Sequence, residues 1–339
     1  MQSTIKDVAQ KAGVSIATVS LVINKNPRIS DITARKVQKA IKSLNYFPSR
    51  SARDLVSKKT GNIGFILTDD HFLRTEPFYT KIFLGTEFEA REGEYYILLT
   101  TVKSDLQEKD KLPRFIVERN VDGIIVAGKV PKLLIDKLCG LKIPIVYVDY
   151  HSPADNCQSV LLDNVQGGIL AVEHLLQLGH KNIGFIGADI EHPSISDRLN
   201  GYKIALAKND VNINPDLIVT SDIYPDRQSG YNSAKKLFSK NKNITALFAC
   251  NDAMALGAMH YLKENKYKIP EDVSIVGFDD VEADQLLETP LTTIRAPKLE
   301  LGARALKLVT EGIKQKNKNP QKILVPVELI VRKSTTKNN

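Results

Sequence analysis

The chain has 339 residues, of which 42% are hydrophobic and 25% are charged, and its formal net charge at pH 7 is +8. This length favours two or three domains with sizeable cores. No run of 18 or more apolar residues occurs, and the N-terminal stretch lacks the apolar segment of a signal peptide. We therefore expect a cytoplasmic protein without a membrane span.

Cysteine and histidine chemistry is not expected to carry the function. The three cysteines, Cys139, Cys157 and Cys250, are far apart and form no CxxC pair. The six histidines show no metal-ligand spacing. We therefore expect no disulfide, no metal, no cofactor and no catalytic residues.

The positive charge is concentrated at the N-terminus. Residues 1–59 hold 12 Lys/Arg and 3 Asp/Glu, a net charge of +9, so the rest of the chain carries −1. A short basic segment joined to a nearly neutral body is typical of a nucleic-acid-binding module. A solvated basic tail is the alternative interpretation.

The first 47 residues predict three short helices. Thr4 and Asp7 have the spacing of a capping box, and Gly13 is placed to end the first helix. Ser15 is placed to cap a second helix within "AGVSIATVSLVIN". A helix, a tight glycine turn and a second helix are the layout of a helix-turn-helix unit.

Ser30 and Asp31 precede a third helix with one apolar face. We expect this face to contain Ile32, Val37, Ile41 and Leu44. Pro48 then interrupts the chain, and "SRSARDLVSKK" is long enough for about two helical turns, which are marginal in water by themselves.

From residue 61 onward, short apolar runs alternate with amphipathic helical stretches. This alternation predicts parallel strands joined by helical crossovers. "NIGFI" occurs at 62–66 and again at 182–186, and each copy opens such a series, which indicates two similar subdomains. The later segments "TTIRAP" and "KILVPVELIVR" are expected to supply crossover and edge strands. The runs are "NIGFIL", "YYILLT", "VDGIIVA", "IPIVYVD", "NIGFIG", "DLIVTS", "ITALFAC" and "VSIVGFD".

An ordered set of motifs covers nearly the whole chain. The set is "TIKDVAQKAGVSIATVSLVIN", "LNYFPSRSARDL", "DNVQGGILAVEHLLQLGHKNIGFIG", "RLNGYKIAL", "ACNDAMALGAM", "DVSIVGFDD" and "TTIRAP". Together they resemble the lactose-repressor/galactose-repressor family of bacterial transcriptional regulators. The resemblance implies a helix-turn-helix, a hinge helix and a body like periplasmic sugar-binding proteins. It also implies a dimer whose affinity for DNA responds to a small effector.

The expected fold is therefore an N-terminal all-α helix-turn-helix domain plus an α/β, periplasmic-binding-protein-like body of two doubly wound parallel-sheet subdomains. We place the helix-turn-helix at 1–47, a hinge helix or linker at 48–59, and the effector-binding and dimerisation body at 60–339. The first subdomain is expected over about 60–161 and 292–322, and the second over about 162–291 and 323–334.

The second helix is expected to read DNA with its outer face, while Val19, Val22 and Ile23 pack inward. The resemblance places Ile16, Ala17 and Leu21 against base edges. Hydroxyl and amide side chains suit contacts to phosphates or nearby bases, and the polar residues expected at the DNA are Thr4, Ser15, Thr18, Ser20 and Asn24.

Leu21 departs from the family pattern, which commonly has an arginine at this position. A leucine cannot bond guanine bidentately, and its apolar partner in the major groove is the thymine methyl group. We therefore expect A·T opposite Leu21. The alternative is that Leu21 faces solvent or another part of the protein.

The segment after Pro48 has a different role by similarity. The resemblance places Leu55 in the central minor groove as a wedge, with Ala52 allowing close approach and Arg50 and Arg53 near phosphates. A basic linker with an incidental leucine is the alternative. We expect a C2 dimer on a palindromic operator, because closed two-fold symmetry matches two identical half-sites.

The effector is expected beyond the carboxyl ends of the strands, where ligands bind in open α/β sheets. By similarity, Arg198, Asn251 and Asp279 are the strongest candidates. A sugar-like effector is favoured, a purine-like corepressor or a partner phosphoprotein is the alternative, and the sign of control stays open. The candidate residues are Asp69, Asp70, Phe78, Tyr79, Asp149, Arg198, Asn251 and Asp279.

Two other classes of protein are disfavoured by the sequence. A cytoplasmic α/β enzyme is disfavoured because no GxGxxG follows a strand, and neither GxxxxGK[ST] nor GxSxG occurs. A transport-linked sugar-binding protein is disfavoured by the basic N-terminus and the missing signal sequence. No apolar heptads follow "ELIVRKS", so a C-terminal tetramerising coiled coil is not expected.

Overall fold

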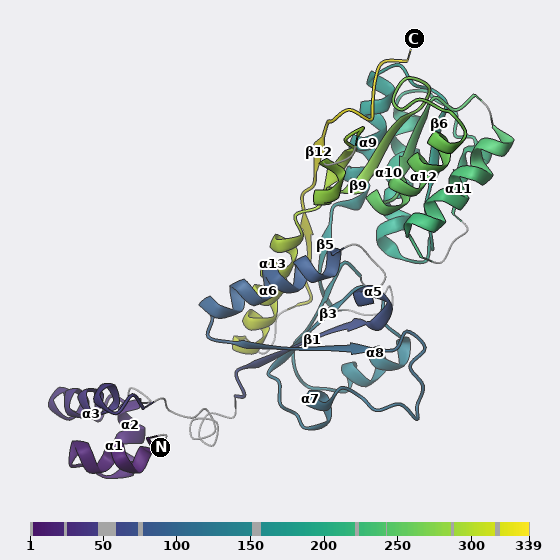
Figure 1. Cartoon of the computed structure of the whole chain (residues 1–339). Coiled ribbons are helices and arrows are strands. Elements are labelled where there is room, and N and C mark those ends of the chain that lie inside the picture. The colour runs from purple at the N-terminus through teal and green to yellow at the C-terminus, as the bar shows by residue number, and fades with distance from the viewer. Residues whose placement is uncertain are drawn as a thin grey trace. The chain divides into compact units, whose positions relative to one another are not determined.

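The computed structural model divides into two compact units, Met1–Thr60 and Gly61–Asn339 (Figure 1). The described residues are 3–23, 26–46, 59–73, 77–150, 157–220, 224–241, 243–285, 288–315 and 319–338. No described helix is both long enough and apolar enough to cross a lipid bilayer.

The described part of the N-terminal unit contains three helices, which begin at the expected capping residues. The Thr4 hydroxyl accepts from the Asp7 backbone N–H while the Asp7 carboxylate accepts from the Thr4 backbone N–H, which completes a capping box. Gly13 ends the first helix at φ 65°, a left-handed conformation that favours glycine. The helices are α1 (Ile5–Ala12), α2 (Ile16–Ile23) and α3 (Asp31–Ser43).

The core of this unit confirms the predicted inner face of α2. The predicted apolar face of α3 is wrong at one residue. Val19 of α2 and Val37 of α3 are fully buried, but Ile32 is 72% exposed. At about 100° per residue, Ile32 lies roughly 140° around the helix from Val37. Ile29 and Ala34 pack against this core instead.

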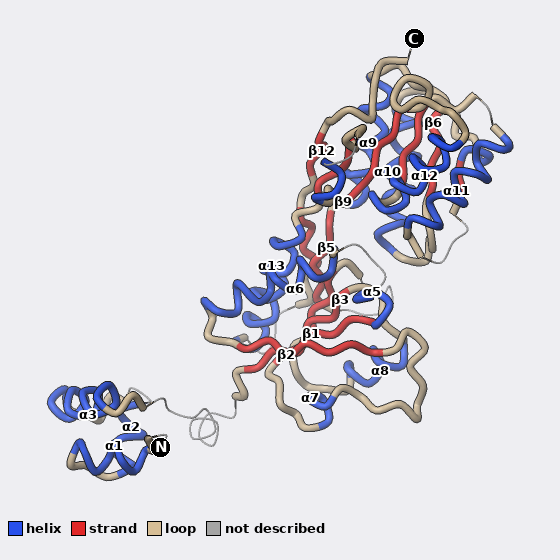
Figure 2. The backbone as a smooth tube through the Cα atoms, viewed as in Figure 1, coloured by secondary structure: helices blue, strands red, loops and turns tan. Residues whose placement is uncertain are grey.

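The described residues of the larger unit form two six-stranded sheets with helices on both faces (Figure 2). The first sheet has the order β11-β5-β4-β3-β1-β2 and its pairs are all parallel. Its strands are β1 (Asn62–Thr68), β2 (Tyr96–Val102), β3 (Gly123–Ala127), β4 (Ile145–Val148), β5 (Gln158–Leu162) and β11 (Lys322–Val325).

The second sheet has the order β12-β10-β9-β8-β6-β7, and only the β10–β12 pair is antiparallel among the described strand pairs of the two sheets. Both sheets therefore have the doubly wound order expected from the alternating pattern. The strands of the second sheet are β6 (Ile183–Ile186), β7 (Ile218–Val219), β8 (Ala246–Ala249), β9 (Ser274–Asp279), β10 (Thr292–Arg295) and β12 (Glu328–Ile330).

Two subdomain boundaries differ from the expected ones, and one strand was missed. The strand over 292–295 belongs to the second sheet, where it pairs with β9, and the strand over 322–325 belongs to the first sheet, where it pairs with β5. Strand pairing between segments far apart in the chain decides both assignments. The missed strand is β5, a short apolar run that periodicity alone does not distinguish from a buried helical segment.

The first sheet is covered on both faces by helices. Alternate residues of β1 point to opposite faces, so Phe65 packs with α6 and α13 while Ile66 packs with α7 and α8. We call this sheet with its helices the first lobe. Its helices are α5 (Asp69–Leu73), α6 (Phe78–Glu92), α7 (Arg114–Val117), α8 (Lys132–Cys139) and α13 (Lys298–Lys314).

The second sheet and its helices form the second lobe. The chain passes between the lobes three times, at residue 163, at 296–297 and at 326–327, so the two lobes share three short connections. The helices of the second lobe are α9 (Asn164–Gln177), α10 (Pro193–Lys208), α11 (Arg227–Lys240) and α12 (Asp252–Glu264), with short 3-10 turns η1 (Pro215–Leu217) and η2 (Glu282–Gln285).

Candidate functional site

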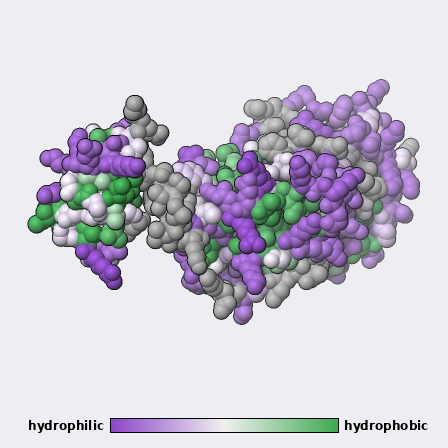
Figure 3. Space-filling model, turned by 90° about the horizontal axis from the view of Figure 1, so that it is seen from below, coloured by the Kyte–Doolittle hydropathy of each residue, from purple (hydrophilic) through white to green (hydrophobic). Residues whose placement is uncertain are grey.

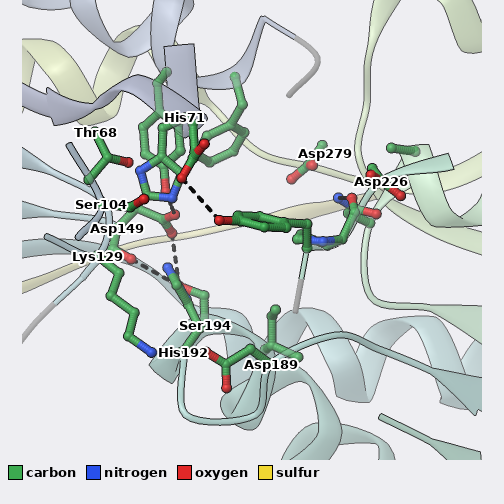
Figure 4. Close-up of a pocket in the computed structure, with 18 of the residues that line it drawn as sticks. Thr68, His71, Ser104, Lys129, Asp149, Asp189, His192, Ser194, Asp226 and Asp279 are labelled. Carbon is green, nitrogen blue, oxygen red and sulfur yellow. Dashed lines mark hydrogen bonds and ion pairs between the residues drawn. The ribbon is translucent and has the colours of Figure 1, made fainter. Parts of the chain in front are cut away.

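A cavity of about 640 Å³ lies between the two lobes of the larger unit (Figure 4). Most of its polar side chains follow the carboxyl ends of strands, where ligands bind in open α/β sheets. They include Thr68 at the end of β1 and Asp70 after it, Lys129 after β3, Asp149 after β4, Asp189 and His192 after β6, and Asp279 at the end of β9.

Arg198 of α10 is held rigidly in the wall of this cavity. Its residue exposure is 5%, its Nε donates to Asn164 Oδ1 at 2.8 Å, and its Nη1 donates to the Cys250 carbonyl at 2.6 Å. Its guanidinium also lies 3.6 Å from the centroid of the Phe278 ring. Since these contacts fix the plane of the guanidinium, its Nη2 group is aimed at Asp279.

Asp279 is a buried carboxylate with spare hydrogen-bonding capacity. Its Oδ1 lies 3.9 Å from Arg198 Nη2 and has no hydrogen-bond partner among the described residues. Burial raises the pKa of Asp279 to about 7, although the Arg198 charge acts to lower it. A buried acceptor without a partner is costly, so this oxygen is suited to receive a ligand hydroxyl or N–H.

Asp149 joins the two lobes through both carboxylate oxygens. Tyr79 Oη of the first lobe donates to Oδ2 at 2.9 Å, and Ser194 Oγ of the second lobe donates to Oδ1 at 2.9 Å. Burial raises the pKa of Tyr79 far above its usual range, with the Asp149 charge adding to the effect. Tyr79 therefore stays a hydrogen-bond donor.

Two histidines line the same cavity, and burial favours the neutral form of both. Burial lowers the pKa of His71 to about 4, and His192 adds to that effect. Burial also lowers the pKa of His192. The His71 ring lies 4.6 Å from the Tyr79 ring, centroid to centroid. The cavity therefore presents neutral imidazoles beside carboxylates and aromatic rings.

Two further contacts connect the lobes across the cavity. Lys129 Nζ lies 2.9 Å from Asp189 Oδ2, and Tyr224 Oη donates to Asp70 Oδ2 at 3.0 Å. Lys129 belongs to the first lobe and Asp189 to the second, and Figure 4 shows the two side chains near each other. Each of these contacts requires the lobes to stay near their present separation, so each contributes to holding this arrangement.

The cavity brings together seven of the eight residues expected at an effector. Asp69 is the exception, because Thr68 and Asp70 on either side of it line the cavity and Asp69 does not. Asn251 does line it, but its amide caps α12 by accepting from the Met254 backbone N–H and donates to the Pro225 carbonyl. The seven are Asp70, Phe78, Tyr79, Asp149, Arg198, Asn251 and Asp279.

Several lining residues were not anticipated. The carboxyl-end rule that singled out Asp149 would also have found Lys129 and Asp189, because each follows a strand. Ser194 and Tyr224 lie further from the strand ends, and only the folded chain brings them to the cavity. The unanticipated polar residues are Thr68, His71, Ser104, Lys129, Lys132, Asp189, His192, Ser194, Tyr224, Asp226, Arg227 and Gln228.

The outer face of α2 in the N-terminal unit is apolar and exposed. Ile16 and Leu21 are 44% and 38% exposed, and Ala17 between them is exposed as well. Figure 3 shows hydrophobic surface on this unit between hydrophilic areas. The Thr18 backbone N–H donates to Ser15 Oγ at 3.1 Å, so Ser15 acts in capping α2.

Part of the expected DNA contact set lies outside the described residues. This part comprises Asn24 after α2 and the four hinge residues Arg50, Ala52, Arg53 and Leu55.

A helix-turn-helix unit joined to a two-lobed α/β body with a central cavity defines the class of ligand-responsive bacterial regulators. Residues 4–49 match the family model described as "Bacterial regulatory proteins, lacI family", and residues 172–335 match the periplasmic binding protein-like domain. The chain belongs to the lacI family. It is a DNA-binding transcriptional regulator and not an enzyme, as the resemblance implied.

Relatives match over nearly their full length. The HTH-type transcriptional repressor PurR of Haemophilus influenzae is 36% identical over 337 residues, 98% of each chain. The ribose operon repressor of the same species is 31% identical over 332 residues, again 98% of each chain.

Solved structures agree with this assignment. The lac repressor dimer bound to operator and an anti-inducer superposes with a TM-score of 0.79 at 26% identity, covering 99% of this chain and 100% of that one. The complex of the regulator CelR with cellobiose gives a TM-score of 0.74 at 28% identity, covering 98% and 100%. A lacI-family regulator from Enterococcus faecium with bound ribose gives 0.69 at 27% identity, covering 82% and 100%.

Proposed function

We propose that this chain is a dimeric cytoplasmic repressor whose cavity binds a neutral polyol, a free sugar or sugar derivative. The observation that carries the effector class is Asp279 Oδ1, a buried acceptor beside Arg198 without a hydrogen-bond partner in the described part of the chain. Five carboxylates among the described residues line the cavity, and a sugar supplies several hydroxyl donors, whereas a purine base offers few N–H donors. The carboxylates are Asp70, Asp149, Asp189, Asp226 and Asp279.

The polyol would bridge Arg198 and Asp279. Their 3.9 Å separation leaves room for a hydroxyl that accepts from the guanidinium and donates to the carboxylate. Phe78 and Tyr79 offer apolar ring surface to the carbon face of a sugar. Two relatives have bound sugars in their solved structures, ribose in one and cellobiose in the other.

A purine-like ligand is the second candidate. Phe78 and Tyr79 meet edge to face with ring centroids 5.1 Å apart, which offers aromatic surface to a planar base as well as to a sugar. The relatives named PurR and the ribose operon repressor cover this chain equally. The similarity alone does not choose between the two ligands.

Thermal shift of the full chain tests the effector class. D-ribose, other free sugars, hypoxanthine and guanine are each added to the wild type, because a ligand of the native state raises its melting temperature. We expect a sugar to raise it and Arg198→Met to abolish the rise, while Lys203→Met on the same helix keeps it. If only hypoxanthine or guanine raises the melting temperature, the effector is purine-like and the proposal of a sugar is wrong.

We propose that α2 lies in the major groove with Ile16, Ala17 and Leu21 against base edges. The support is their exposure on a helix whose own surface carries no charge, within a segment of net charge +9 that attracts phosphates. Thr4, Thr18 and Ser20 would contact the backbone nearby, and Ser15 can reach it only if its capping bond loosens.

Gel shift with random double-stranded DNA at two salt concentrations tests this DNA role. We expect retention that weakens steeply with salt and a selected palindromic site. Repeating the shift with the effector found above decides whether it acts as inducer or corepressor. Loss of all DNA binding at low salt would contradict the proposed contacts.

We propose that the dimer forms through an apolar surface of the first lobe. Leu84 and Phe88 lie one turn apart on α6 and are exposed, and Leu99 is exposed on the adjoining edge strand β2, on the face that α6 covers. Exposed apolar side chains on an edge strand and its helix are typical of a surface that a partner covers. A second copy is favoured because a lac repressor dimer shares the fold.

A further inference from the structure

Lys298 is a buried basic residue next to the Asp279 turn, outside the lining of the cavity. It is the first residue of α13, its residue exposure is 7%, and it is not among the residues that line the cavity. Its Nζ donates to the backbone carbonyls of Asp279, Asp280 and Ala296. Since an ammonium group has three N–H donors, these three carbonyls account for all of them.

The turn that Lys298 holds has an unfavourable backbone. Asp279 has φ 122° and Asp280 has φ 54°, values that are costly for residues with a Cβ. The Asp280 carboxylate is bound within the second lobe by Arg295, at 2.7 Å, and by Arg332. The second lobe therefore fixes the side chain of Asp280, while Lys298 fixes the carbonyls of the turn and so the direction of the Asp279 carboxylate.

Lys298 itself belongs to the first lobe. Its helix α13 packs against α6 so closely that a Cβ on Gly85 would lie 2.0 Å from the Leu299 carbonyl oxygen. Thr86 Oγ1 of α6 also donates to the Gly302 carbonyl at 3.2 Å. Figure 1 shows the two helices side by side. Such packing lets the pair move only as one body.

The same pair of helices reaches the cavity and the apolar surface. Phe78 and Tyr79 at the start of α6 line the cavity, and Lys298 Nζ lies 6.0 Å from the centroid of the Phe78 ring. Further along α6, Leu84 and Phe88 are exposed. Through Lys298, a displacement of the Asp279 turn would therefore displace the packed α6–α13 pair. The proposed dimer surface lies further along α6 in this pair.

We propose that Lys298 is a positioning residue that couples occupancy of Asp279 to the placement of the α6–α13 pair. This inference rests on the proposed function, in which Asp279 receives the effector. A ligand bonded to the Asp279 carboxylate moves the turn, the Asp279 and Asp280 carbonyls move with it, and Lys298 carries that motion past the connection at 296–297 into the first lobe. The competing explanation is that Lys298 only stabilises the fold.

Hydrogen–deuterium exchange of the full, ligand-free chain tests the coupling without an effector. Lys298→Met removes the three donors and keeps the length, Lys298→Arg keeps the charge, and Lys307→Met is a matched control on the same helix, where Lys307 pairs with Glu89 at 3.4 Å. We expect Lys298→Met to speed exchange on the order of tenfold in 279–282 and 78–86 and not in β1 or β3.

The exchange results separate the two explanations. Lys298→Arg should restore slow exchange in both segments, and Lys307→Met should match the wild type. Wild-type exchange in Lys298→Met would overturn the proposal. Faster exchange throughout the body would also overturn it, because that result means a purely structural role.

A second experiment measures the coupling to DNA, using D-ribose and hypoxanthine as probes and an operator selected from random DNA with the wild type. We expect the probe that binds to change wild-type operator affinity by about fivefold or more. In Lys298→Met the ratio of operator affinities with and without the probe should fall toward one. The affinity of the variant for the probe, measured by calorimetry, should change by less than about threefold. A full wild-type ratio in Lys298→Met would overturn the proposal. If neither probe binds the wild type, the proposed effector is wrong, and the exchange experiment still decides the role of Lys298.

Discussion

Arg198 Nη2 and Asp279 Oδ1 face each other at 3.9 Å, too far apart for a direct hydrogen bond. The bonds from Arg198 to Asn164 and to the Cys250 carbonyl hold the guanidinium in place, so it does not approach Asp279 more closely. The gap therefore stays available for a ligand group that accepts from one side and donates to the other.

Asp279 should make the stability of the protein depend on pH in a particular direction. Its pKa is raised to about 7 in the folded protein, chiefly by burial, against 3.8 ordinarily. Between these values the folded chain binds a proton that the unfolded chain does not, so the Asp279 contribution to stability falls as pH rises from about 4 to about 7. The size is at most about 4 kcal/mol.

Denaturant unfolding of the wild type and of Asp279→Asn at several pH values checks this dependence. The wild type should lose stability relative to the variant across that interval and show no further relative change above pH 8. A difference between the two proteins that is independent of pH, or one that rises with pH, would contradict the raised pKa.

Leu21→Arg should change the base preferred at one position of each half-site. Arginine bonds the O6 and N7 atoms of guanine, whereas leucine contacts the thymine methyl group, and a good bidentate pair discriminates by about 1–3 kcal/mol. Selection from random DNA with both proteins gives the two consensus sequences, and we expect G·C to replace A·T opposite this residue. Ile32→Arg adds the same charge at an exposed site on α3 and should leave the consensus unchanged. The same consensus from Leu21→Arg and the wild type would refute the contact.

Gly85→Ala should destabilise the larger unit. The added methyl group would meet the Leu299 backbone, so α6 and α13 must separate, and overpacking of this kind costs about 1–3 kcal/mol. Gly140→Ala is a matched control, because its Cβ would meet no atom closer than 3.4 Å. Thermal denaturation of both variants should show a lower melting temperature for Gly85→Ala alone.

Phe88→Asp should weaken the dimer without unfolding the protomer. The Phe88 side chain is half exposed on the outer face of α6, so the change removes apolar contact area and adds a charge to the proposed surface. Sedimentation velocity at several concentrations should show dissociation at higher concentration than for the wild type. Val117→Asp, on α7 against the opposite face of the sheet, should sediment as the wild type does. If Phe88→Asp stays as dimeric as the wild type, the dimer lies elsewhere.

Much of the fold follows from local pattern. The capping residues Thr4 and Ser30 mark the starts of α1 and α3, and the apolar runs that open with Ile63 and Ile183 mark the first strand of each lobe. The strand-end rule also identified Asp149 and Asp279. These signals succeed because capping, turn formation and strand burial involve residues close together in the sequence.

The sequence by itself determined the basic N-terminal module, the doubly wound class and most of the carboxylates at the cavity, because each depends on charge, periodicity or position at a strand end. Only the tertiary structure decided that β10 belongs to the second sheet and β11 to the first. It also decided that Ser194 bonds Asp149 across the lobes and that Lys298 reaches the Asp279 turn. These contacts join residues separated by 16 to 163 positions in the chain. Which of them form depends on how the three connections fold the two lobes together, and no local pattern encodes that choice.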